Sequence, residues 1–435
     1  MSSWSEADLE LRLCRALDLA RKAIHHFAID GYANPDSPAC SFGPEKVVAE
    51  TAMLIHAASA SRSRPNIASR IDHLAQRLAP HARSERVLVD IALHPALAFK
   101  FAVPHILLTK LGYPDAGFDD FLRCCASSQM RNAEDRPPSS SLERRWIRSL
   151  WNGPDSGLSP RANLRDSMLN WPLDILGGLR MDAYAFTHLI MYCTDFGFRR
   201  PRLPRSRPAI LMDVGSMLAR YMDAEDYDLA GELLLAWPLI GAPWSPSATF
   251  AFGVLASIED RVGVLPCGNV NLARLAQLEG EERARYALGS AYHTAYVMGF
   301  LCAASLRPGR APPVTIAGPQ FDAACLSRLM RHLDDDRGHW RSEFLSLAQR
   351  EQRALIPFVL DVAIMQNCRR RDYQAVSTIL SLAYEYDAAD SPMCRQAFEL
   401  LERIASCSTA IRLRSGAPSE EALAERSATK APTPA

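Results

Sequence analysis

One apolar segment carries four polar side chains at helical spacing. The segment RMDAYAFTHLIMYCTDFG, residues 180–197, places them at i, i+4, i+8 and i+11 on one helix face: Tyr184, His188, Tyr192 and Asp195. Most of the remaining positions are Ala, Phe, Leu, Ile, Met or Cys. Burying such polar groups without partners costs roughly 2–7 kcal/mol each. They must therefore meet one another, other polar groups, water or a ligand.

Two further segments have the same character. In EERARYALGSAYHTAYVMGFLCAAS, residues 281–305, three polar residues stand at i, i+7 and i+10: Tyr286, His293 and Tyr296. A Gly and a Ser between them leave room for a ligand or for close helix packing. The segment FKFAVPHILLTKLGYPD carries His105 near its start. Three helices that each direct a His towards a shared interior could form the floor of an active site.

We expect acid–base chemistry at this site, without a metal. Neutral imidazole and ionised carboxylate suit proton transfer near neutral pH, so His188 is assigned as general base or acid and Asp195 as its orienting or second acid–base group. The predicted hydrogen-bonding or electrostatic partners are Tyr192, His293 and Tyr296. The predicted substrate-binding residues are His105, Tyr184 and Tyr286. In the alternative, these are core polar groups satisfied by backbone groups and loop ends.

Spacing argues against a bound metal or nucleotide. The three His-bearing segments contain no HxH, HxxxH, HExxH or ExxH pattern, so metal ligation would need distant segments to converge. The eleven cysteines include no CxxC pair. The chain also lacks GxGxxG after a strand, GxxxxGK[ST] and GxSxG. We therefore expect no metal and no cofactor.

An arginine-rich loop follows the Asp195 segment. Residues 199–207, RRPRLPRSR, hold five arginines, from Arg199 to Arg207. Guanidinium groups bind phosphates and carboxylates through paired N–H donors. The loop could hold an anionic group of a substrate or of a carrier protein, or it could be a solvated surface loop.

The elements that must position these residues are helices. Apolar residues recur at i, i+3, i+4 and i+7 along most of the chain, and alternating strand patterns are nearly absent. A weak repeat is also present: Asp226-Tyr227 opens DYDLAGELLLAWPLIG, and Asp372-Tyr373 opens DYQAVSTILSLAYEYD. In each we expect Asp to cap the second helix of an αα-hairpin.

The predicted fold is an all-α array of degenerate αα-hairpins, closed into an α/α toroid-like barrel with a central cavity. An open solenoid is the alternative, but the units have unequal lengths and no fixed period. We expect one helical domain over residues 1–414. Residues 415–435 have the small, polar, Pro-containing composition of a disordered tail.

The composition of the chain limits which partners and which cellular compartment we expect. Lys plus Arg and Asp plus Glu both number 49, so the zero formal charge argues against broad nucleic-acid binding and against a polybasic membrane patch. No apolar stretch reaches the roughly 18–20 residues of a membrane span. The scattered cysteines and the acidic start predict a reducing cytoplasm. Only five of the 49 basic residues are lysine, which with abundant Ala suggests a bacterium with a GC-rich genome.

Several motifs together resemble a known family. They are HLIMYCTDFG (188–197), YHTAYVMGFL (292–301), LGYPD (111–115) after a Pro-His helix, and ERRWIRSLW (143–151). The chain resembles, over about residues 10–410, an uncharacterised bacterial family with a domain of unknown function, often met near natural-product genes. The resemblance implies an all-helical, toroid-like fold and no established activity. The shape is also similar to the α/α barrels of terpene and lanthionine cyclases, whose Asp-x-Asp-Asp and zinc-binding Cys-His sets are absent here.

These observations predict a bacterial enzyme of small-molecule metabolism, with natural-product metabolism as one such context. Its ligand is expected to be a small, partly apolar metabolite bound in a central helical cavity. The rival hypothesis is a non-catalytic helical scaffold or partner-binding protein, in which the polar stripes are satisfied core groups.

Overall fold

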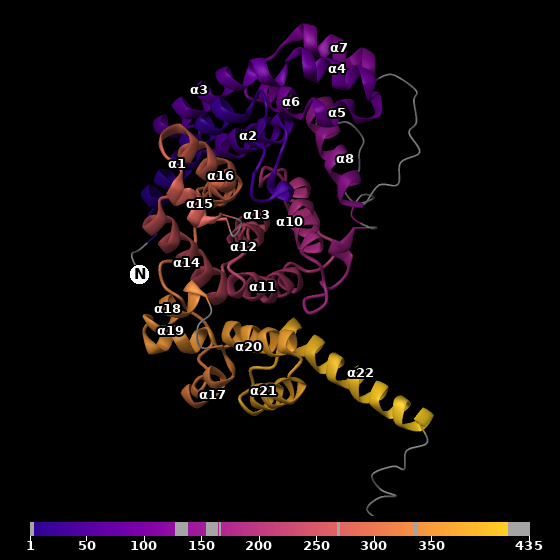
Figure 1. Cartoon of the computed structure of the whole chain (residues 1–435), viewed down its shortest axis with the longest axis vertical. Coiled ribbons are helices and arrows are strands. Elements are labelled where there is room, and N and C mark those ends of the chain that lie inside the picture. The colour runs from indigo at the N-terminus through magenta and orange to yellow at the C-terminus, as the bar shows by residue number, and fades with distance from the viewer. Residues whose placement is uncertain are drawn as a thin grey trace, which may run out of the picture.

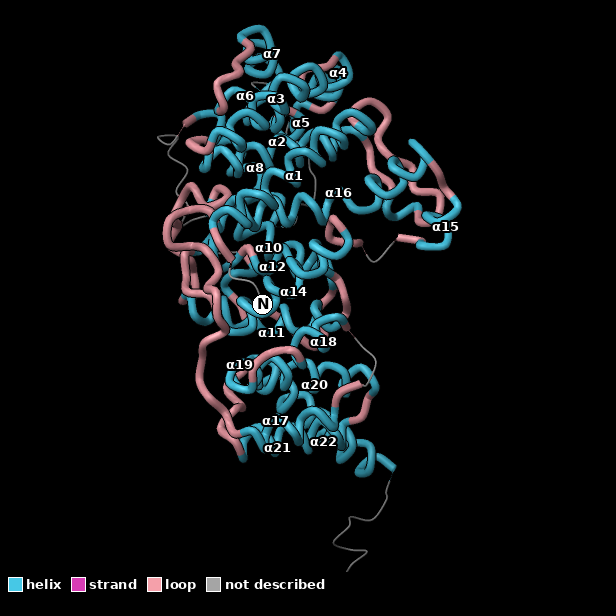
Figure 2. The backbone as a smooth tube through the Cα atoms, turned by 90° about the vertical axis from the view of Figure 1, so that its left-hand side faces the viewer, coloured by secondary structure: helices cyan, strands magenta, loops and turns pink. Residues whose placement is uncertain are grey.

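The computed structural model describes residues 4–126, 138–153, 164, 167–267, 270–334 and 338–415. Within these residues every regular element is a helix, and the only strand-like feature is an isolated antiparallel bridge between Tyr32 and Phe42. The helices are stacked along one long axis (Figures 1 and 2). The all-helical prediction is confirmed. No helix in the described part of the chain is both long enough and apolar enough to cross a membrane.

The first group of helices occupies the upper part of Figure 1. It consists of α1 (Glu6–Phe27), α2 (Pro44–Ala58), α3 (Pro65–Ala82), α4 (Glu85–Leu93), α5 (Ala98–Phe101), α6 (Val103–Lys110), α7 (Ala116–Ala126) and α8 (Pro138–Asn152). Helix α1 begins at a capping box, in which the Ser5 hydroxyl accepts from the Asp8 N–H and the Asp8 carboxylate accepts from the Ser5 N–H. Its apolar face, including Leu9 and Leu13, is fully buried.

The second group forms the middle of the molecule (Figure 1). It consists of α10 (Arg180–Thr194), α11 (Arg207–Asp223), α12 (Tyr227–Leu234), α13 (Ala236–Ile240), α14 (Pro246–Val262), α15 (Leu272–Gln277) and α16 (Gly280–Ser305). Helix α16 returns to the first group and packs along α1 and α2. The apolar face of α16 is buried there, which joins segments more than 200 residues apart in the chain.

The last group lies at the lower end (Figure 2). It consists of α17 (Ala323–Leu329), α18 (His339–Leu345), α19 (Gln349–Ala354), α20 (Ile356–Arg370), α21 (Tyr373–Glu385) and α22 (Pro392–Ser415). Short 3₁₀ helices occur at Pro38–Cys40, Ser59–Ser61, Pro95–Leu97, Met168–Asn170 and Met330–His332. The predicted tail, residues 415–435, lies outside the described residues except for Ser415, which ends α22.

Both predicted helical hairpins are present. Helix α12 packs against α11, and α21 packs against α20. The Asp226 carboxylate caps α12 by accepting from the Leu229 N–H at 3.3 Å, and the Asp372 carboxylate caps α21 by accepting from the Ala375 N–H at 2.9 Å. The expected role of the two aspartates as N-caps is confirmed.

Six helices contact one another in a cyclic order. Helix α2 packs against α6, α6 against α8, α8 against α10, α10 against α12, α12 against α16, and α16 against α2. Three of these helices, α6, α10 and α16, carry the histidines singled out by the sequence.

Candidate functional site

Five helices line a cavity of about 200 Å³. Its walls come from α2, α8, α10, α12 and α16, together with residues that directly follow α10 and α12. On α16, three lining residues follow helical spacing at i, i+4 and i+7, namely His293, Val297 and Phe300, so one face of the helix forms the wall. The complete lining is Lys46, Ala49, Glu50, Met53, Glu143, His188, Met191, Tyr192, Phe196, Glu232, Leu235, His293, Val297 and Phe300.

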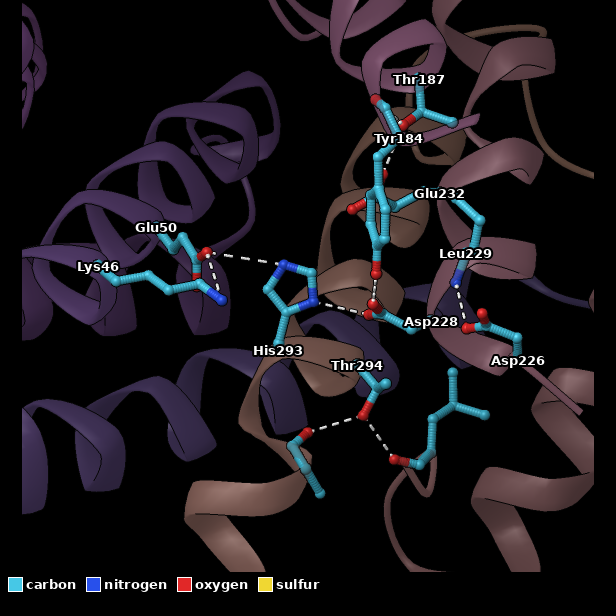
Figure 3. A network of polar contacts seen from close by, with 12 residues as sticks. Lys46, Glu50, Tyr184, Thr187, Asp226, Asp228, Leu229, Glu232, His293 and Thr294 are labelled. Carbon is cyan, nitrogen blue, oxygen red and sulfur yellow. Dashed lines mark hydrogen bonds and ion pairs between the residues drawn. The ribbon is translucent and has the colours of Figure 1, made fainter. Parts of the chain in front are cut away.

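His293, which lines the cavity, forms a charged pair with Asp228 on α12 (Figure 3). Nδ1 of His293 donates to Oδ1 of Asp228 at 2.6 Å, and the hydroxyl of Tyr184 donates to the other oxygen of Asp228. Nε2 of His293 lies 3.6 Å from Oε1 of Glu50, which is 3.8 Å from Nζ of Lys46. His293 therefore lies between two carboxylates.

These contacts keep both members of the pair ionised. Burial opposes the charge of His293, but Asp228 and Glu50 outweigh burial and raise the pKa of His293 to about 10. Burial also opposes ionisation of Asp228, but His293, Tyr184 and Arg180 outweigh it and hold the pKa of Asp228 well below its usual value. At neutral pH the pair is an imidazolium and a carboxylate.

Glu232 and His188 form a second pair in the cavity, and here both groups are uncharged. Burial, and then the charge of Asp228, raise the pKa of Glu232 to about 8. Its side chain is only 3% exposed and accepts from Thr187 Oγ1 at 2.5 Å. Burial and the charge of His293 lower the pKa of His188, whose Nε2 lies 3.9 Å from Glu232 Oε1. Near neutral pH, a protonated carboxyl group therefore faces a neutral imidazole.

Aromatic rings hold His188 in place. Its ring lies between Tyr184 and Tyr192, with centroid distances of 6.0 and 5.9 Å. The Tyr192 hydroxyl donates to Glu143 at 3.3 Å, and its ring stacks on Trp146 at 4.9 Å. The rings of Tyr184, His188 and Tyr192 thus lie next to one another along α10, as predicted, and His188 and Tyr192 line the cavity.

Asp195 does not join this stripe. It has a positive φ of 50° at the end of α10, so the helical periodicity stops before it. Its Oδ1 accepts from Trp146 Nε1 at 2.7 Å and lies 3.1 Å from His56 Nε2. Burial opposes ionisation, but His56, Trp146 and Arg199 outweigh it and lower the pKa of Asp195. The predicted partnership of Asp195 with His188 is not formed, because the chain reversal directs the carboxylate to His56 instead.

Two other predicted site residues are bonded away from the cavity. His105 is fully buried, accepts from Arg83 Nε at 3.0 Å, and lies 2.7 Å from Oδ1 of Asp119. The Tyr286 hydroxyl donates to Asp36 at 2.8 Å. Both residues belong to local networks, and neither lines the cavity of His188 and His293.

Tyr296 also points away from the lining. Its hydroxyl is 2.7 Å from Thr51 Oγ1, and its side chain is buried between α16 and α2. Burial raises the pKa of the Tyr296 hydroxyl well above its usual value. Tyr296 therefore supports the packing of the wall that carries His293.

A family model described as a domain of unknown function (DUF6895) matches residues 13–303. The chain belongs to the DUF6895 family. No curated protein and no solved structure matches it. Every residue that lines the cavity falls within the DUF6895 region, and α17 to α22 lie beyond it.

Sequence reasoning missed the acidic half of the site in this DUF6895 chain. Asp228 and Glu232 are one turn apart on α12, among Leu and Ala residues. Two acids at i, i+4 on an apolar helix are as costly to bury as the His188 stripe, so the same argument applied to DLAGELL would have found them. Lys46 and Glu50 on α2 have the same spacing, which resembles an ordinary surface ion pair.

Two further predictions concern metals and the arginine loop. In the described part of the chain, no group of three or more His, Cys, Asp or Glu side chains is arranged to hold a metal ion. In the loop, Arg199 donates to Ser149 at 2.9 Å and Arg205 to Asp213 at 2.7 Å. Three arginines of the loop are exposed, namely Arg200, Arg202 and Arg207.

Proposed function

We propose that this DUF6895 protein is an enzyme of small-molecule metabolism that moves protons within the cavity. His188 is the general base, and Glu232 is the general acid. The observation that carries the proposal is the 3.9 Å separation between a neutral imidazole and a buried carboxyl group whose pKa is raised to about 8. Environments that drive the pKa values of neighbouring groups apart are typical of acid–base catalysis.

The second pair supplies the electrostatics. His293 is positively charged and lines the same cavity, so it stabilises negative charge that develops on a substrate after proton removal. Asp228 orients the His293 ring through its 2.6 Å hydrogen bond. This replaces the role that the sequence assigned to Asp195.

The reaction class that fits these groups is a proton shift that leaves the oxidation state unchanged. His188 removes a proton from one atom of the substrate, and Glu232 delivers its own proton to another. A bond to hydrogen breaks at the first atom, another forms at the second, and the electron pair moves between them within the substrate. The proton on His188 then returns to Glu232, and both groups regain their starting states.

The finer predictions about shape and context remain part of this proposal. We propose that the six helices α2, α6, α8, α10, α12 and α16 form the toroid-like ring, a view supported by their cyclic order of contacts. We also propose a bacterial, cytoplasmic role linked to natural-product genes, for which the support is the composition and the resemblance described above.

The test uses a small-molecule extract of bacterial cells, because the substrate is unidentified. Wild-type protein, His188→Gln and Glu232→Gln are each incubated with the extract, and all masses are followed by liquid chromatography and mass spectrometry. We expect wild type to convert one compound into an isomer of equal mass, seen as a shift in retention time. Neither variant should do so at more than about 1% of the wild-type rate, because acid–base groups contribute typically 10²–10⁴-fold.

Two outcomes would overturn the proposal. Equal conversion by wild type and both variants would remove His188 and Glu232 from the chemistry. A molecule that co-purifies with the protein but is never converted would favour the rival hypothesis of a non-catalytic binding protein.

A further inference from the structure

A second hollow lies next to the cavity. It is a groove of about 550 Å³ bordered by α2, α4, α5 and α6, by the end of α3, by Glu143 of α8 and by the two residues that follow α1. Four residues line both the groove and the cavity, namely Lys46, Ala49, Met53 and Glu143. Because these four residues border both hollows, the cavity and the groove are adjacent.

The groove differs from the cavity in its chemistry. Its inner wall is made of aliphatic and aromatic side chains, including Val48, Val87, Phe101 and Val103. Ile29 lies at its edge with 70% of its surface exposed, which leaves an apolar side chain open to solvent. An apolar wall that leads to a few convergent polar groups is the usual composition of a small-molecule site.

Charged groups on the groove occur in both signs. Arg86 and Glu45 form an ion pair at 3.5 Å, and Lys100 and Asp90 also lie on the lining. These groups do not favour either charge on the part of a ligand that occupies the groove. Contact with Val48, Val87, Phe101 and Val103 therefore selects this part by its apolar surface.

Charges in the cavity are largely compensated. His293 has Asp228 and Glu50 as partners, and Lys46 also pairs with Glu50. Glu143, which lines both hollows, receives the Tyr192 hydroxyl. Because Glu232 is protonated, the charged lining residues are two cations, Lys46 and His293, and two carboxylates, Glu50 and Glu143, so neither sign is in excess. A charged head group of either sign would therefore add an uncompensated charge to the cavity.

The uncharged groups remain open to a ligand. Oε1 of Glu232 receives no hydrogen bond in the described structure, and His188 Nε2 lies 3.9 Å from it. Both side chains line the cavity. A carboxyl proton and an imidazole nitrogen together suit a neutral head group that accepts one hydrogen bond, such as a carbonyl.

We propose that the substrate is an amphipathic molecule with an uncharged carbonyl-type head in the cavity and an apolar chain or ring in the groove. This inference rests on the proposed acid–base function for the reaction, but the binding of the apolar part is separate from it. The head contacts Glu232 and His188. The apolar part passes Met53 and Glu143, which line both hollows, and lies against Val87 and Phe101.

Binding of four probes to the full chain tests the proposal by calorimetry. The probes are 2-butanone, 2-nonanone, nonanoate and nonylammonium. Each methylene that is fully buried tightens binding about fourfold, so five added methylenes could contribute about a thousandfold. We expect 2-nonanone to bind at least about thirtyfold more tightly than 2-butanone, and more tightly than either charged probe.

A matched pair of substitutions locates the apolar part. Val87→Trp fills the groove and should weaken binding of 2-nonanone at least about tenfold, with less than about twofold effect on 2-butanone. Val262→Trp, on exposed α14 surface outside both hollows, should change neither. If Val87→Trp lowers the melting temperature, Ile29→Asp is the second variant. Its exposed position tolerates the change, while a carboxylate at the groove edge should weaken 2-nonanone binding.

The outcomes separate this inference from the proposed function. Equal binding of 2-butanone and 2-nonanone, or no effect of groove variants, would overturn the apolar site even if Glu232→Gln abolishes conversion. Tighter binding of nonanoate or nonylammonium would overturn the uncharged head. Chain-length dependence that Val87→Trp removes supports the groove even if no conversion is ever detected.

Discussion

Replacing Glu232 with Gln tests whether this buried carboxyl group is protonated. The substitution keeps the size and shape of the side chain and removes its ionisable proton. The pKa of Glu232 is raised from 4.5 to about 8, so between these values the folded chain holds a proton that the unfolded chain has lost. Wild-type stability should therefore fall as pH rises through this window, whereas the Gln variant lacks this contribution.

The magnitude follows from the two pKa values. The interval from 4.5 to about 8, at about 1.4 kcal/mol per pH unit, gives a ceiling of about 5 kcal/mol. At pH 5 the free energies of unfolding should agree within about 1 kcal/mol. At pH 8 the variant should be the more stable protein by up to this ceiling, less whatever relaxation the cavity allows.

The assay is urea denaturation at half-unit steps from pH 5 to pH 8. The informative quantity is the difference in free energy of unfolding between variant and wild type. The raised pKa of His293 changes the stability of both proteins in the same pH range, so it cancels in this difference. Glu281→Gln, an exposed change in the first turn of α16, is the control for loss of one surface charge. Parallel pH profiles for wild type and Glu232→Gln, or a variant less stable at pH 8, would show that Glu232 is ionised and would refute the assignment as general acid.

Three further results are expected. His188→Leu removes no hydrogen bond to any described residue and should change stability by less than about 1 kcal/mol. His56→Leu deprives buried Asp195 of a partner and should cost about 1–3 kcal/mol, so equal losses in denaturation would contradict the contrast. Asp228→Asn should cost about 2 kcal/mol at pH 7, and because the pKa of Asp228 is depressed, the deficit should shrink below pH 4; a pH-independent deficit would argue against the ion pair. A chain that ends at residue 414 should melt within about 1 °C of the full chain by calorimetry, since the composition of the tail predicts no burial, and a drop of several degrees would show that the tail docks.

Local patterns predicted the helices and part of the site. The i, i+4, i+8 spacing of Tyr184, His188 and Tyr192 holds because α10 is continuous to Thr194. It fails at Asp195, where a left-handed residue ends the helix and redirects the side chain. A Gly after Asp195-Phe196 signals a helix end, but it does not show on which side of it the periodicity stops.

Long-range pairing could not be predicted in this way. His293 meets Asp228 because α16 packs against α12, and it meets Glu50 because α16 also packs against α2. Helical periodicity identifies a buried face without naming the helix that covers it. For the same reason the sequence does not distinguish His105 from His188, which has a similar local pattern. The two differ in their surroundings, because Arg83 and Asp119 lie beside His105.

The packing of α16 along α1 has a consequence for synthesis of the chain. The ribosome completes α1 roughly 280 residues before it completes α16, and at about 5–20 residues per second this interval lasts on the order of 15–60 s. During that time the part of α1 that packs against α16 has no partner, whereas α2 and α3 can already cover the part that packs against them. Nascent chains of this protein should therefore be strong clients of chaperones that cover exposed apolar helices until the last wall of the cavity emerges.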